Sequence, residues 1–120
     1  MDKKKQFYDY LEEQKADTQK EIETAMQENR KDEAGFLKAK GNMYDIFKAY
    51  FDVAEKAETE TTEKIAFFQS KTQSLTGAWK MSLEKAKEHN DTAKIVVEEQ
   101  KLAAAEEIMA AYKKIMEDER

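Results

Sequence analysis

Three charged side chains fall on apolar helix faces and are the strongest candidates for chemistry in this sequence. Lys40 lies between the directions of Phe36 and Phe47 at helical spacing, and Glu98 and Lys101 lie one turn apart on another apolar face. A buried cluster of such groups can bind an anion or shift the pKa of a lysine. The same side chains can instead extend to the rim of the core or pair with one another to fix helix register, and we expect this structural role.

The single histidine and the many carboxylates do not form a recognisable catalytic or metal site. His89 lies two turns from Ser82, about 10 Å along a helix, which is too far for a nucleophile–base hydrogen bond. A di-iron bundle needs Glu-x-x-His motifs, and the residue at that spacing before this histidine is Ala86. Most carboxylates alternate with lysines, as on solvated helix faces, and no calcium-loop spacing occurs. We therefore predict no catalytic residue, no bound metal and no cofactor.

The composition is typical of a single helical domain. The chain has 120 residues, of which 39% are charged and 40% are hydrophobic, with three Gly and no Pro. So little Gly and Pro favours helices over sheets, whose turns need both. One Trp, five Tyr and six Phe argue against disorder, because disordered segments are poor in aromatic residues. We predict one domain over residues 1–120.

The charge and the absence of a long apolar run limit the partners and the location that we expect. A net charge of −5 repels phosphate backbones, so we expect no nucleic acid partner. No apolar run approaches the roughly 20 residues that cross a bilayer, and acid-rich polar faces disfavour an anionic membrane surface. Charged residues directly after Met1 predict no signal peptide. With no Cys in the chain, we expect a cytoplasmic protein.

Potential capping residues predict three helix breaks along the chain. Asn29 and Asn90 tolerate the left-handed conformation that ends a helix, and the acidic residues that follow, Asp32 and Asp91, can cap the next helix. The middle break rests on the hydroxyl side chains within 59–62. Together the breaks predict an antiparallel up-down four-helix bundle with helices at about 3–29, 33–59, 62–89 and 92–118.

The middle break leaves a second architecture open. The threonines within 59–62 can also lie inside a helix, which would join the second and third helices into one continuous rod. Such a rod would expose a long apolar face, so the chain would have to dimerise to cover it. The alternative to the bundle is therefore a long-helix dimer.

The segment 36–54 is more apolar than a position in a simple bundle requires. At about 100° per residue its apolar side chains cover an arc of about 200°, whereas a surface helix needs roughly 100–140°. Either neighbouring helices cover both flanks, or one flank is an interface, for which homodimerisation is the simplest solution. The flank residues predicted to form this interface are Leu37, Tyr44, Ile46, Phe51 and Val53.

The sequence contains no motif that identifies a function. We expect a non-enzymatic interaction or structural protein that forms a homodimer or docks another helical protein through 36–54. One alternative is an amphipathic protein whose helices open on the surface of a membrane or a storage granule. Another is a ligand-binding or catalytic bundle that uses Lys40, Glu98 and Lys101, with Tyr44 or Tyr112 as hydrogen-bond partners.

Overall fold

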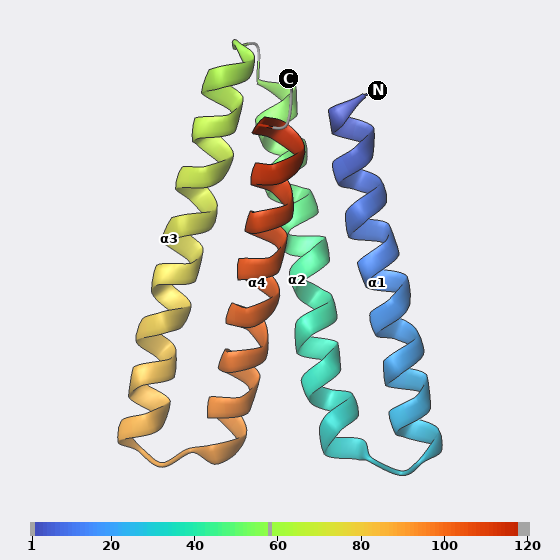
Figure 1. Cartoon of the computed structure of the whole chain (residues 1–120). Helices are drawn as coiled ribbons and strands as arrows, with labels where there is room; N and C mark the ends of the chain where they lie inside the picture. The colour runs from blue at the N-terminus through green and yellow to red at the C-terminus, as the bar shows by residue number, and fades with distance from the viewer. Residues whose placement is uncertain (1, 58, 118–120) are drawn as a thin grey trace.

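The computed structural model describes residues 2–57 and 59–117 and consists of four helices joined by short connections (Figure 1). The helices are α1 (Lys3–Gln27), α2 (Lys31–Lys56), α3 (Thr61–Glu88) and α4 (Thr92–Glu117). Helices that follow one another in sequence run antiparallel, so α2 and α4 run in the same direction. The predicted four-helix bundle is confirmed, with helix ends within three residues of those expected. Position 58 and the predicted end of the last helix at residue 118 lie outside the described residues.

The first and third helix breaks form as expected, at asparagines whose backbone adopts the left-handed conformation. Asn29 has φ of 61° and Asn90 has φ of 54°, conformations that few residues other than Asn and Gly adopt readily. After Asn90, the Asp91 amide donates to the Ala86 carbonyl (3.0 Å) and closes the end of α3. The Asp91 carboxylate then accepts a hydrogen bond from the Lys94 amide (3.3 Å), which confirms it as a cap of α4.

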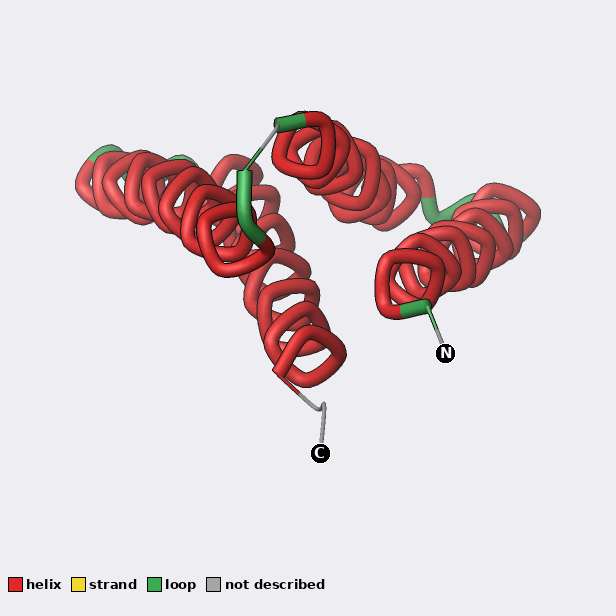
Figure 2. Tube along the Cα trace, turned by 90° about the horizontal axis from the view of Figure 1, so that it is seen from above, coloured by secondary structure: helices red, strands yellow, loops and turns green. Residues whose placement is uncertain are grey.

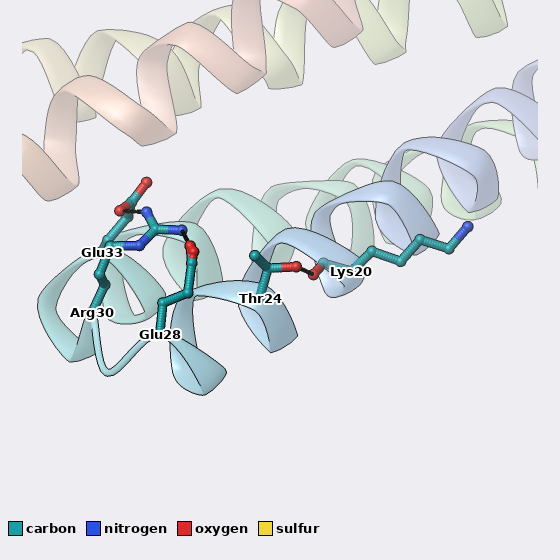
Figure 3. A network of polar contacts seen from close by, with 5 residues as sticks. All are labelled: Lys20, Thr24, Glu28, Arg30 and Glu33. Atoms are coloured by element: carbon teal, nitrogen blue, oxygen red, sulfur yellow. Dashed lines mark hydrogen bonds and ion pairs between the residues drawn. The ribbon is translucent and has the colours of Figure 1, made fainter.

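The prediction that Asp32 caps the second helix is wrong. The helix α2 begins at Lys31, so Asp32 lies inside its first turn, and the N-cap residue is Arg30, whose side chain caps nothing. Arg30 instead pairs with Glu28 (3.2 Å) on one side of the turn and with Glu33 on the other (Figure 3). The connection between α1 and α2 is therefore closed by the backbone, where the Arg30 amide donates to the Ala25 carbonyl (2.7 Å), and the exposed Arg30 side chain lies between two carboxylates in place of an aspartate cap.

The continuous rod considered as an alternative is also wrong. The backbone is extended at Ala57 (ψ 137°) and at Glu60 (ψ 155°), so the chain turns between α2 and α3. Glu60 is the N-cap of α3 and its side chain makes no capping hydrogen bond, so the hydroxyls within 59–62 do not cap this helix as expected. Lys64 ties the two helices together instead, since its Nζ donates to the Glu55 carbonyl (3.3 Å).

A layer of four aromatic rings joins all four helices. Each helix contributes one ring, and every pair among them is in contact, with centroids between 4.1 and 6.0 Å apart. These residues are Phe7, Phe51, Phe68 and Tyr112. All four are at most 2% exposed, and the edge-to-face and stacked arrangements add to the stabilisation that their burial provides. The layer fixes the register of the bundle.

The two ends of the bundle differ in how closely the helices approach. At one end, which we call the closed end, α1 begins, α4 ends and the α2–α3 connection lies (Figure 1). At the other, the open end, lie the α1–α2 and α3–α4 turns, and there the hairpin α1/α2 diverges from the hairpin α3/α4 (Figures 1 and 2). The aromatic layer belongs to a large main core. A separate small cluster lies entirely within the first hairpin and contains Ile22, Ala25, Ala34 and Leu37.

Most of the wide apolar arc of α2 is covered by the chain itself. The helix contacts all three of the others, most extensively α1, and it packs more closely on α4 across the diagonal than on its sequence neighbour α3. This diagonal contact flattens the bundle, which measures 46 × 33 × 24 Å. Of the two explanations that the sequence leaves open for the arc, the structure supports coverage by neighbours on both flanks.

Candidate functional site

Three of the five predicted interface residues lie inside the bundle. Leu37 is 9% exposed, Tyr44 is 1% exposed and Phe51 is fully buried. The reason is that α1 and α4 pack on the flanks of α2, which a sequence reading of one helix cannot anticipate. Ile46 is half-buried against the main core, and Val53 is exposed at 56%. The predicted surface therefore does not exist as one continuous patch on this chain.

The predicted polar cluster forms in part, on α4 and α3. Glu98 is 5% exposed, and its Oε1 lies 3.4 Å from the Nζ of Lys101, one turn further along the same helix. The Lys101 ammonium also lies over the ring of Trp79, 4.9 Å from its centroid. One ammonium therefore serves both a carboxylate and an aromatic face, so its ion pair with Glu98 is long.

The carboxylate of Glu98 is incompletely satisfied. Its Oε2 is buried and has no hydrogen-bond partner among the described residues. Burying a charged oxygen without a donor is unfavourable, because water is removed and no protein group replaces it. Glu98 shares a helix face with Leu102 and Ala105, both members of the main core, so this oxygen lies on the core side of α4. A donor brought to this position would stabilise the structure.

Lys40 does not join this cluster. It is half-buried on α2 and makes no hydrogen bond or ion pair with any described residue. Its positive charge acts on Tyr44, which lies four residues further along the same helix. Burial raises the pKa of Tyr44. Lys40 and the nearby Thr18 hydroxyl partly oppose this rise, although the Tyr44 hydroxyl makes no hydrogen bond of ordinary geometry.

The closed end carries polar contacts that sequence reasoning missed. The Tyr8 hydroxyl donates to the Asp52 carboxylate and links α1 to α2. Lys64 lies 3.7 Å from the Glu55 carboxylate and links α3 to α2. Both pairs join residues on different helices, so no spacing rule along one helix could reveal them. Burial and the hydrogen bond to Asp52 raise the pKa of Tyr8 to about 12.

Two of the surface grooves lie along α4 and are separate from the charged residues predicted to carry chemistry. One, of about 420 Å³, lies between α3 and α4 and is lined by residues that include Thr72, Met109 and Lys113. Another, of about 370 Å³, lies between α1 and α4 beside Tyr10 and Lys114. Neither groove is lined by Lys40, Glu98 or Lys101. The carboxylate and the lysines therefore do not converge on either of these grooves.

The remaining candidate, His89, lies at the C-cap of α3 and is exposed to solvent. Its amide donates to the Lys85 carbonyl (3.1 Å), so the residue takes part in ending the helix. Within residues 2–57 and 59–117, no three His, Cys, Asp or Glu side chains lie close enough together to hold a metal ion. Across the same residues, no helix combines the length and the apolar character needed to cross a membrane.

No protein-family model, curated protein or solved structure shows a significant match to the chain.

Proposed function

We propose that this protein is a non-enzymatic interaction module that docks a helical partner at its open end. The observation that carries the proposal is the division of the apolar side chains into the main core and a separate cluster within the first hairpin. Between the two, the hairpins diverge (Figure 2). A bundle that used all four helices only for its own stability would be expected to pack them along their full length.

Apolar side chains at the open end belong to neither cluster. Phe36 on α2 is half-buried, as are Ile95 and Val97 on α4, and none of them packs in the main core or in the first-hairpin cluster. Each lies in the first third of its helix, near the α1–α2 or the α3–α4 turn. Half-buried apolar side chains at this end of the bundle support docking there, because a second apolar surface can remove them from water.

This proposal moves the contact surface away from the centre of α2. The sequence favours docking through 36–54, and most of that segment is covered by α1 and α4. What is left for a partner at the open end is the beginning of the segment at Phe36, together with the start of α4. The polar groups support a non-enzymatic role, because Lys40 stands apart from the Glu98–Lys101 pair. The expected cytoplasmic location stays a prediction.

A photo-crosslinking amino acid placed at position 36 tests the proposal in the native cell. We expect a discrete adduct that mass spectrometry identifies as one helical protein, either a second copy of the chain or a different partner. The matched control places the same amino acid at position 53, where Val53 is an exposed apolar residue of the same helix far from the open end. Equal adducts at both positions, or none at position 36, would overturn the proposal.

A further inference from the structure

The helix α3 leaves two large apolar side chains uncovered on the side away from the bundle. It packs on α4 and α2 and has no contact with α1 among the described residues, so it lies at an edge of the bundle (Figure 1). Its buried side chains, among them Phe68 and Thr72, face the other helices. Phe67 and Met81 lie on the outward side, where they are 37% and 66% exposed. A partner that covered them would remove apolar surface from water.

These two side chains belong to one stripe along the helix. Phe67 and Met81 are two heptads apart, about 21 Å along the axis, and at 100° per residue they point within about 40° of one another. The exposed residues between them on the same stripe carry no charge, and they are Ser70, Ser74 and Ala78. A helix face that meets only water usually carries charged residues. In a chain that is 39% charged, this stripe is therefore suited to contact another helix.

Opposite charges lie at the two ends of this stripe. Glu63 and Lys85 continue it by one turn beyond Phe67 and Met81, and both are exposed without an ion pair to a described residue. Counted from Ser74, the two apolar side chains lie seven residues to either side and the two charges lie eleven. A second copy turned end for end about Ser74 therefore sets Phe67 against Met81 of the other copy and Glu63 against Lys85. We call this stripe, from Glu63 to Lys85, the outer face of α3.

The centre of the outer face allows two helices to approach closely. Its residues at positions 70, 74 and 78 are small, so the helix backbones can come near enough for the larger residues at the ends to touch. Gly77 borders them, and no atom of a neighbouring helix lies within 4 Å of the position that its Cβ would take. A glycine inside a helix lowers stability relative to alanine, and packing within the chain does not require one here. A partner helix lying against this face accounts for it.

We propose that two copies of this chain pair through the outer faces of α3, with the two helices antiparallel and a two-fold axis beside Ser74. Each copy covers Phe67 and Met81 of the other, and a pair of Glu63 with Lys85 forms at each end of the contact. The arrangement of apolar and charged residues about Ser74 favours a second copy, because an unrelated partner requires no such symmetry. The inference goes beyond the proposed function, since the outer face of α3 shares no residue with the open-end surface.

Cysteine crosslinking tests the position of the axis, because the chain has no Cys of its own. The variant Ser74→Cys places a thiol beside the axis, and mild oxidation should join two copies through a disulfide in high yield. The matched control is Gln73→Cys, since Gln73 is also exposed but points about 100° away from Ser74 around the same helix. Equal yields at the two positions, or no covalent dimer at position 74, would overturn the inference.

Charge reversal tests the pairs at the ends, with the dimer dissociation constant measured by analytical ultracentrifugation. We expect the wild-type chain to dimerise. Glu63→Lys and Lys85→Glu should each weaken the dimer about tenfold, because each replaces two attractions between exposed groups by two repulsions. The double variant Glu63→Lys/Lys85→Glu should recover the wild-type constant, since opposite charges then face one another again. A monomeric wild-type chain at millimolar concentration, or no recovery in the double variant, would contradict the pairing.

A change at an exposed apolar residue separates this surface from others on the chain. Met81→Lys should weaken the dimer about a hundredfold, because it sets a charge against Phe67 of the other copy. The matched control is Val53→Lys, since Val53 is similarly exposed on α2 and should leave the dimer unchanged. Circular dichroism should show wild-type helicity for both variants, because neither residue is buried. If Met81→Lys leaves the dimer as strong as Val53→Lys does, the inference is wrong, whereas the position-36 adduct tests the open end independently.

Discussion

At the closed end every helix contributes a ring to one aromatic layer, whereas at the open end the first hairpin carries a small cluster of its own. The closed end also has polar contacts between helices, including the Tyr8–Asp52 hydrogen bond. At the open end the notable polar groups are Lys40 and Glu98, and neither is fully paired. The closed end thus packs all four helices on one another, whereas the open end leaves Phe36 half-buried and Lys40 without an ion pair to a described residue.

The largest expected difference between the ends is in the cost of removing a buried side chain. Phe47 is fully buried in the main core, and we expect Phe47→Ala to lower the free energy of unfolding by about 3–5 kcal/mol. Leu37→Ala in the first-hairpin cluster should cost about 2 kcal/mol, since fewer neighbours surround the gap. Urea denaturation measures both, with Val53→Ala as a control that should change stability by less than about 0.5 kcal/mol. A larger loss for Leu37→Ala than for Phe47→Ala would show that the first-hairpin cluster stabilises the fold more than the main core does.

A second difference should appear at alkaline pH. Burial raises the pKa of both Tyr8 and Tyr10 to about 12, and hence these residues favour the folded state only while neutral. Tyrosine in the unfolded chain ionises near pH 10. The contribution of Tyr8 and Tyr10 to the free energy of unfolding is therefore complete below about pH 10 and is lost as the pH rises toward 12. We expect the thermal unfolding midpoint, followed by circular dichroism, to fall across this interval.

The double variant Tyr8→Phe/Tyr10→Phe sharpens this prediction because it keeps both rings and removes both ionisable groups. Its unfolding midpoint should fall less between pH 10 and 12 than that of the wild-type chain. An equally steep fall in the double variant would show that other groups cause the alkaline loss.

The smallest effect concerns a single hydrogen bond between helices at the closed end. At neutral pH, Tyr8→Phe removes the donor to Asp52, and we expect a loss of about 1 kcal/mol in the free energy of unfolding. The matched control is Tyr50→Phe, because Tyr50 is also half-buried and makes no hydrogen bond with a described residue. Equal losses in the two variants would show that the hydrogen bond does not stabilise the closed end.

The helix breaks could be predicted from the sequence because they depend on local conformation. Asn29 and Asn90 end helices by adopting a left-handed backbone, a property of that residue type. The ion pair of Glu98 and Lys101 could also be predicted from the sequence, since residues three apart on a helix are neighbours. Both predictions needed information from only a few consecutive residues.

The covering of α2 and the separation of Lys40 from the other charges could not be predicted in the same way. Periodicity shows how wide an apolar arc is, but it does not say which helix packs on it. The diagonal contact between α2 and α4 buries Tyr44 and Phe51, and divergence of the hairpins leaves Phe36 half-exposed. These outcomes depend on the packing of all four helices at once, as does the Tyr8–Asp52 contact.

Native-state amide hydrogen exchange compares the packing of the two ends in one experiment. We predict that amides around Phe36 and Ile95, near the starts of α2 and α4, exchange much faster than amides around Phe51 and Tyr112 in the aromatic layer. Equal protection at the two ends would show that the open end is packed as firmly as the main core, which the division of the apolar side chains into two clusters does not predict.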